Sequence, residues 1–189
     1  MGANSALIFN VIINVAILLV FFRFLMQLAA VSPYNPVVLS TVKATKIVDI
    51  FSRIFPTVAK GRVNLAALIL LIVLYLLKNY GGMYLSGAMP NSPVHLLILT
   101  FVTIIQDLLR FCRYLIFASI ILSWVVMFTQ SRSPYIEVIQ ELAEPLLAPF
   151  RRILPNMGMI DLSPLVALFS LYIIEMIMNE AAIVLLTGL

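Results

Sequence analysis

The chain contains 189 residues, of which 63% are hydrophobic and 11% are charged, whereas a soluble domain is about half apolar and about a quarter charged. A chain so short and so apolar cannot enclose its hydrophobic side chains in a water-soluble core, so the composition predicts an integral membrane protein. A bilayer core about 30 Å thick takes about 20 apolar residues per helix. A few spans therefore use most of the chain and leave no room for a separate soluble catalytic domain.

The charged and metal-ligating residues exclude several classes of function. The net charge of +4 is ordinary for a membrane protein with basic cytoplasmic loops and predicts no nucleic-acid contact. Cys112 is the single cysteine and His95 the single histidine, which excludes an intrachain disulfide and a His/Cys metal cluster. The sequence has no glycine-rich phosphate loop and no arrangement typical of nucleophilic catalysis. We expect no enzymatic activity, no metal and no cofactor.

The first half predicts two spans joined by an amphipathic segment. Residues 6–31 form an apolar run that is longer than the roughly 7–15 apolar residues of a signal peptide, so we interpret it as an uncleaved first span. After two prolines, residues 37–55 place apolar side chains at spacings of three and four, which predicts an amphipathic helix on the membrane surface. Residues 63–85 are the second span. These elements make a first repeat over residues 1–92.

The second half begins with an apolar stretch that is too long for one span. No proline or glycine occurs in residues 94–128, and one helix over this stretch would reach about 52 Å. Two interpretations are open. Residues 94–104 form a separate interfacial or re-entrant segment, or a long helix projects beyond the membrane. We place the third span at residues 105–129.

The remainder of the second half repeats the order of the first. Residues 135–154 predict a second amphipathic segment. Ser163 is typical of a helix N-cap and Pro164 of a first helical position, so the fourth span runs over residues 164–187. Residues 93–189 thus form a second repeat.

The two halves align with each other at a shift of 99 residues. At that shift Arg53-Ile54-Phe55-Pro56 falls on Arg152-Ile153-Leu154-Pro155, and Asn64 falls on Ser163. The fold we expect is therefore an all-α membrane protein with about four transmembrane helices, arranged as two repeated units. Because each unit has two spans, an axis along the membrane normal would relate them.

The basic residues predict the orientation of the chain. They occur in the two connections that hold the amphipathic segments: Lys43, Lys46, Arg53, Lys60, Arg62, Arg132, Arg151 and Arg152. The two tails and the connection after the second span contain no lysine or arginine. Cytoplasmic loops collect these residues, so we expect both amphipathic segments on the cytoplasmic side and both termini on the other side.

Several polar side chains fall within the expected spans, and we single out Asn14, Arg110, Arg113, Glu175 and Glu180. Ionisable groups are unfavourable in hydrocarbon, so they are expected to pair or to face the bundle. Counted from the cytoplasmic helix ends, Asn14, Arg113 and Glu180 lie at a similar depth, so we expect Glu180 to pair with Arg113 or Arg110 near Asn14. Glu175 lies deeper. We expect it to bond to a neighbouring helix, with proton relay by a carboxyl of raised pKa as the alternative.

Two further charged residues interrupt the apolar runs. Asp107 precedes Arg110 by three residues, so the two can pair along one helix. Arg23 lies about eight residues from the cytoplasmic end of the first span. We expect its guanidinium to reach back to the interface.

A proline- and arginine-rich motif ends the second amphipathic segment. It reads P-x-x-x-P-x-R-R-x-x-P and continues into D-x-S-P. Its residues are Pro145, Pro149, Arg151, Arg152, Pro155, Gly158, Asp161, Ser163 and Pro164. Together with Ser123-Trp124, Ser131-Arg132-Ser133-Pro134 and Tyr34-Asn35-Pro36, the motif resembles the YggT family, also called YlmG, and the resemblance covers essentially the whole chain.

The resemblance implies a small protein of the inner (plasma) or plastid membrane without established enzymatic activity. Relatives are linked to osmotic tolerance, to envelope or division-related organisation and, in plastids, to cytochrome maturation and nucleoid placement. Lys46 and Ile50 stand where the second half has the motif prolines, so we expect residues 145–164 to carry the role of the motif. That role is contact with anionic lipid headgroups or an acidic partner, or else only the setting of membrane topology.

Two functional hypotheses follow. The first is a non-enzymatic inner-membrane scaffold, assembly or envelope-stress factor, which acts through cytoplasm-facing amphipathic segments and contacts membrane lipids and a membrane-protein partner or a second copy. The alternative is a subunit of an ion channel or transporter in which the intramembrane charged residues line a path. Four helices enclose only a narrow pore, so the alternative requires an oligomer.

Overall fold

The structure is a computed structural model that describes residues 3–59, 61–87, 92–154 and 161–187. Four of its helices are long and apolar enough to cross a membrane. They are α1 (Ala3–Leu28), α4 (Leu65–Ser86), α5 (Pro93–Thr129) and α7 (Ser163–Thr187). At about 1.5 Å per residue each exceeds the bilayer core of about 30 Å, so the chain has the architecture of an all-α, multi-pass membrane protein.

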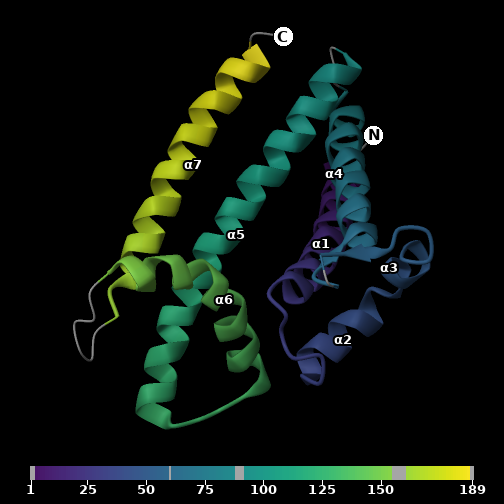
Figure 1. The fold of residues 1–189 in the computed structure, drawn as a ribbon. Helices are drawn as coiled ribbons and strands as arrows, with labels where there is room; N and C mark the ends of the chain where they lie inside the picture. The colour runs from purple at the N-terminus through teal and green to yellow at the C-terminus, as the bar shows by residue number, and fades with distance from the viewer. Residues whose placement is uncertain (1–2, 60, 88–91, 155–160, 188–189) are drawn as a thin grey trace.

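Short elements connect the four long helices. They are α2 (Pro36–Ala44), α3 (Lys46–Phe51), the antiparallel pair β1 (Thr57–Val58) and β2 (Val63–Asn64), and α6 (Pro134–Ile153). Figure 1 shows α2, α3 and α6 at one end of the bundle, while α1 begins and α7 ends at the other end. We call α2, α3 and α6 the peripheral layer.

Local capping fixes where several helices begin. Asn35 and Ser133 each accept a hydrogen bond from a backbone N–H of the helix that follows, and each precedes a proline at the first helical position. This cap-proline pair is favourable because proline has no N–H to leave unpaired. Asn64 caps α4 in the same way, through the N–H of Ala67. Asn64 is the residue that aligns with Ser163, the expected cap of the fourth span, and Ser163 itself is the first residue of α7.

The first peripheral segment is divided. The sequence predicts one helix over residues 37–55, but α2 and α3 are separated at Thr45, whose φ is −111° and ψ is 36°. The carbonyl and hydroxyl of Thr45 are both engaged by a side chain of α1, described below, and this contact accompanies the break.

The third long helix has no break at residue 105. Of the two interpretations that were open for residues 94–104, the structure has the long helix, so the separate segment and the boundary at 105 are wrong. The reason is local, since no proline or glycine interrupts the stretch. With 37 residues α5 is about 55 Å long. Its C-terminal turns continue past the level at which α6 crosses to α7 (Figure 1).

Two hydrophobic clusters hold the bundle together. The first lies between α1 and α4 and includes Val48 of α3. The second joins α5, α6 and α7 to Met26, near the end of α1. Phe111 of α5 packs against both clusters, and its ring meets that of Phe21 edge-on with the centroids 5.2 Å apart. The peripheral helices are therefore part of the packed bundle, and α7, which contacts α5 and α6, is the least buried of the four long helices.

Candidate functional site

A buried arginine ties the first peripheral segment to the bundle. Arg23 of α1 is 9% exposed. Its Nη1 donates to the Thr45 carbonyl at 2.8 Å and to the Thr45 hydroxyl at 3.1 Å, and its Nη2 pairs with the Asp49 carboxylate. Charge-assisted hydrogen bonds of this kind are about twice as strong as neutral ones. Arg23 therefore extends to the peripheral layer, where its partners are groups of the protein itself.

The outer side of this segment combines cations with apolar side chains. Its exposed basic and large apolar residues are Leu39, Lys43, Lys46, Ile47, Ile50, Arg53 and Ile54, which we call the basic-apolar surface. Ile50 is 62% exposed and Ile54 is 73% exposed. Apolar side chains beside lysines and arginines are typical of helices that lie among lipid headgroups. The only acid between them in sequence, Asp49, is already paired with Arg23.

The family motif forms a second anchor, between α6 and α7. Arg151 donates through Nε to Asp161 at 2.9 Å and pairs through Nη1 with Glu144. The other oxygen of Asp161 accepts the backbone N–H of Ser163 at 2.9 Å, where α7 begins. Burial opposes ionisation of Asp161, but the hydrogen bonds from Ser163 and Arg151 outweigh it and lower the pKa of the carboxyl. The motif therefore brings Arg151 and Asp161 together as a clasp.

The other motif residues have separate positions. Arg152 is exposed, and Pro145 and Pro149 lie inside α6. Pro164 follows the first residue of α7, while Pro155 and Gly158 fall outside the described residues. The two arginines of the motif therefore differ in their surroundings, because Arg151 is paired with two carboxylates whereas Arg152 is exposed.

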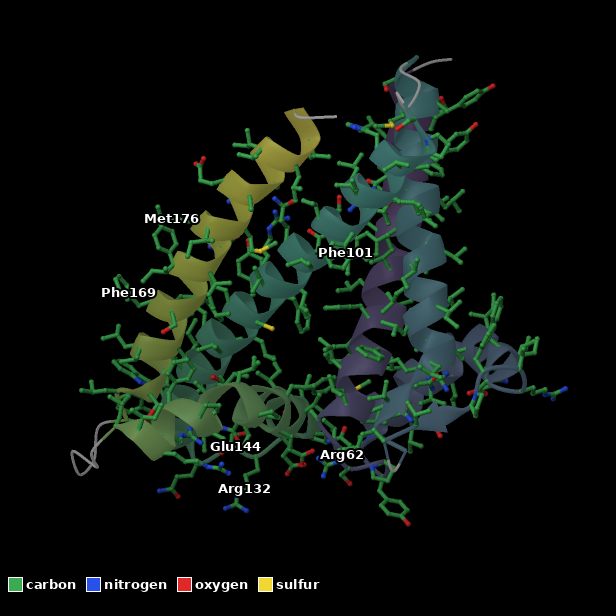
Figure 2. All side chains as sticks on the ribbon, turned by 45° about the horizontal axis from the view of Figure 1, so that its top comes forward. Arg62, Phe101, Arg132, Glu144, Phe169 and Met176 are labelled. Carbon is green, nitrogen blue, oxygen red and sulfur yellow. The ribbon has the colours of Figure 1, made fainter. Side chains whose placement is uncertain are left out.

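The two halves of the peripheral layer touch each other. The Asn35 amide donates to the Pro134 carbonyl at 3.0 Å, and the Glu141 carboxylate accepts the Ser32 N–H at 3.0 Å. The exposed face of α6 carries Glu137, Glu141 and Glu144. The acidic surface of α6 therefore lies beside the chain that leads into α2, at the same end of the bundle as the basic-apolar surface, where Figure 2 labels Arg62, Arg132 and Glu144.

Within the spans, Arg113 joins α5 to α7. Its Nη1 lies 2.6 Å from an oxygen of Glu175, so the expected bond between Glu175 and a neighbouring helix is confirmed. The expected pairing of Glu180 with Arg113 or Arg110 is wrong, since Arg113 pairs with Glu175 and Arg110 with Asp107. Depth was counted from Thr129, the end of α5, but α5 continues past the start of α7, and Arg113 therefore lies opposite Glu175, more than one turn before Glu180.

A second cluster of polar side chains surrounds Asp107. Its carboxylate accepts from Arg110 at 3.1 Å and from the Tyr75 hydroxyl at 3.1 Å, and it lies 3.6 Å from the Lys78 ammonium. The expected Asp107–Arg110 pair is confirmed. Asn14 lines a cavity of 200 Å³ beside Tyr75, Asp107 and Arg110. The α4 partners Tyr75 and Lys78 were not expected as partners of Asp107, although a lone lysine in an apolar stretch is a signal of such a pairing.

Most of the charged side chains within the spans are therefore engaged in ion pairs, several of them between helices. In the part of the chain that the structure describes, no three histidine, cysteine, aspartate or glutamate side chains gather as a metal site. The arrangement of the described polar groups is that of structural anchors within the bundle and of a charged layer at one end of it.

Comparison with known proteins places this geometry in a family. The sequence model of the CCB3/YggT family matches residues 98–182, which span most of α5, all of α6 and most of α7. No solved structure matches the chain significantly.

Bacterial relatives match nearly the whole chain. An uncharacterized protein of Pseudomonas aeruginosa is 33% identical over 93% of this chain and 89% of its own length. An uncharacterized protein of Haemophilus influenzae is 34% identical over 94% of this chain and 93% of its own length. The uncharacterized protein YggT of Escherichia coli K12 is 34% identical over 88% of this chain and 85% of its own length. The chain therefore belongs to the CCB3/YggT family.

Proposed function

We propose that this protein is a non-enzymatic scaffold of the inner membrane, whose peripheral layer lies on the cytoplasmic leaflet and presents a rigidly mounted surface to a membrane-protein partner. The observation that carries the proposal is the anchoring of α2 and α3 by the buried Arg23. A segment that only had to connect two spans would not need a buried guanidinium to hold it in place.

The basic-apolar surface supports a position on an anionic leaflet. Asp49 is the one acid between Lys43 and Arg53 in the sequence and it pairs with Arg23, so the exposed Lys43, Lys46 and Arg53 leave this segment with a positive surface. Each basic residue near an anionic surface contributes about 1 kcal/mol of attraction. The same bias in basic residues orients this end of the bundle toward the cytoplasm and both termini away from it.

The acidic face of α6 supports a role in assembly. Glu137 and Glu141 are exposed at the same end of the bundle as the basic-apolar surface, and an anionic leaflet repels them. A negatively charged surface suits a basic segment of a partner protein, because complementary charges speed association and discriminate between partners. A partner recruited in this way fits a contribution to envelope assembly or to osmotic tolerance.

The channel or transporter alternative receives less support. Arg113 pairs with Glu175, and Asp107 pairs with Lys78 and Arg110. Charges that neutralise one another across helices act as bonds within the bundle. Ions passing along these residues would have to break those bonds.

An environment-sensitive fluorophore tests the position of the basic-apolar surface. We would place it on a cysteine at Ile50, in a Cys112→Ser background, and reconstitute the full chain in vesicles of phosphatidylglycerol or of phosphatidylcholine. We expect blue-shifted emission in the anionic vesicles and loss of the shift with Lys43→Glu/Lys46→Glu. A probe at Glu137 serves as the matched control and should remain in water. Emission from Ile50 that is typical of water in both kinds of vesicle would contradict the proposal.

A further inference from the structure

A groove lies where α5, α6 and the start of α7 meet. It has a volume of about 720 Å³, and its lining includes Trp124, Glu144, Arg151, Asp161 and Leu165. One side is polar and is formed by the Arg151 clasp, and the other side is apolar and is formed by the C-terminal turns of α5. We call it the junction groove.

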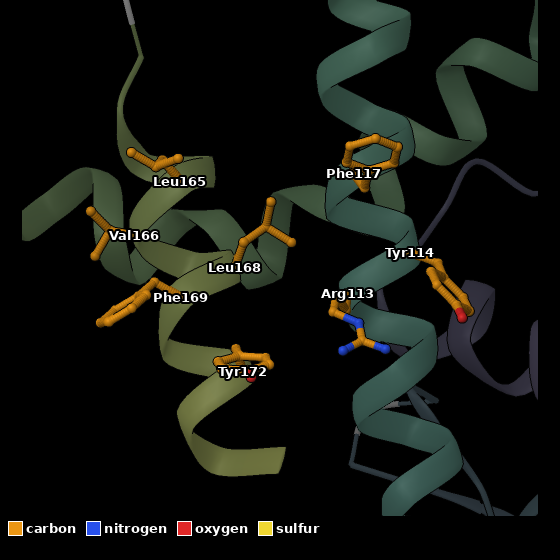
Figure 3. A pocket seen from close by; sticks show the side chains of 8 residues that line it. All are labelled: Arg113, Tyr114, Phe117, Leu165, Val166, Leu168, Phe169 and Tyr172. Atoms are coloured by element: carbon orange, nitrogen blue, oxygen red, sulfur yellow. The ribbon is translucent and has the colours of Figure 1, made fainter. Parts of the chain in front are cut away.

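A second groove continues along the spans between α5 and α7. It has a volume of about 740 Å³ and is lined by apolar and aromatic side chains, with Arg113 as its one charged residue, and that charge is paired with Glu175. Figure 3 shows Arg113, Tyr114 and Phe117 on α5 and, across from them, Leu168 and Tyr172 on α7. We call it the span groove. Both volumes fall in the range of about 300–1,000 Å³ that is usual for ligand sites.

Leu165 lines both grooves, so the two grooves adjoin each other at this residue. This residue lies in the first turn of α7, where the span begins, and the exposed Trp124 is of the residue type that favours the membrane interface. The junction groove therefore lies at headgroup depth and the span groove at the depth of acyl chains. An occupant that fits both is an amphiphile with its polar part at Arg151 and a chain along α7.

The charges of the junction groove select the headgroup. Two carboxylates, Glu144 and Asp161, surround one guanidinium, so the groove is negative overall. The bonds to these carboxylates use Nε and Nη1 of Arg151, and a guanidinium has five N–H donors, so it can also donate to a phosphate. The excess carboxylate charge suits an ammonium group, while an anionic headgroup would be repelled.

We propose that the two grooves bind one phospholipid with an aminated headgroup, of the phosphatidylethanolamine type. Its phosphate lies at Arg151, its ammonium at Glu144 and Asp161, and one acyl chain in the span groove. This site is separate from the basic-apolar surface of α2 and α3, and the proposal does not rest on the scaffold role.

Native mass spectrometry of the full chain in detergent tests the site. We would add phosphatidylethanolamine, phosphatidylcholine and phosphatidylglycerol with the same acyl chains at equal concentration. The ethanolamine lipid should be retained about tenfold better than the other two, because choline has no N–H to donate and glycerol leaves the anionic charge uncompensated. Equal retention of the three lipids would overturn the proposal.

A matched pair of variants on α7 locates the binding. Leu165→Trp fills the point where the grooves meet and should abolish the preference. Ile177→Trp is the control, since Leu165 is 66% exposed and Ile177 is 62% exposed but Ile177 lines neither groove. Glu144→Gln changes no volume and should reduce the preference for ethanolamine over choline. The proposal fails if both tryptophan variants behave alike and Glu144→Gln leaves the preference unchanged.

Discussion

The guanidinium of Arg23, in the first membrane helix, donates to the carbonyl of Thr45, in the break between α2 and α3. The same carbonyl accepts the backbone N–H of Val48 at 3.0 Å, in the first turn of α3, so the guanidinium is a second donor to it and comes from another element. The contact couples the position of the peripheral segment to that of α1, which makes it the first target for mutation.

Replacing Arg23 should release α2 and α3 while the spans persist. Arg23→Met removes the guanidinium from the Thr45 carbonyl and from Asp49. We expect this loss to lower the stability of α2 and α3 by about 2–3 kcal/mol. The figure is modest because about half of the Asp49 side chain is open to solvent. Hydrogen exchange of amides 41–51 should accelerate at least tenfold. The exposed Arg62→Met is the control and should leave these amides unchanged. If exchange in α2 and α3 is unaffected by Arg23→Met, the anchor is not what holds the segment.

The Arg113–Glu175 contact should behave as a buried ion pair. Glu175→Leu leaves Arg113 unpaired within a span and should lower the stability of the detergent-solubilised protein by about 3 kcal/mol. The double variant Arg113→Leu/Glu175→Leu should recover much of the lost stability, because two apolar side chains leave no unpaired charge within the span. Thermal unfolding measures the series. Glu180→Leu is the comparison, and an equal loss there would contradict the assignment of the partner.

The Arg151–Asp161 clasp should weaken in acid. Because hydrogen bonds to Ser163 and Arg151 lower the pKa of Asp161, its contribution to stability is present at pH values above the ordinary aspartate pKa and is lost as pH falls through the lowered value. Hydrogen exchange at the start of α7 should accelerate over that acidic range. Asp161→Asn should show faster exchange at neutral pH and no further change in acid. An identical acid response in the variant would assign the transition to another group.

Two adjacent glycines of α4 should respond differently to alanine. A Cβ at Gly81 would lie 2.4 Å from Cζ of Phe9, whereas a Cβ at Gly82 would meet nothing within 4 Å. Gly82→Ala should raise stability by about 0.5–1 kcal/mol, because alanine is the better helix former. Gly81→Ala gains the same propensity but must displace the Phe9 ring of α1, so its net effect should be smaller or unfavourable. Thermal unfolding of the two variants measures the difference, and equal stabilisation would show that α1 and α4 do not pack this closely.

The sequence predicted the elements well because their signals are local. Apolar runs, the prolines that separate them, and the alternation of charged and apolar residues in α6 depend on neighbouring positions only. The partner of Arg113 could not be predicted in this way. It depends on how far α5 is displaced along α7, which is a property of packing. The partners of Arg23 could not be predicted for the same reason, since Thr45 and Asp49 lie 22 and 26 residues further along the chain and approach Arg23 only in the folded bundle.

The length of α5 has a consequence for the surrounding lipid. Its neighbour α4 has 22 residues against the 37 of α5, so no single bilayer thickness suits both, and the membrane must deform locally or the longer helix must tilt. A thinning membrane would leave still more of the Trp124–Phe128 turns outside the hydrocarbon, and a thickening one would draw them in. Such a helix makes the energy of the protein depend on membrane thickness, and therefore on any stress that stretches the cell boundary.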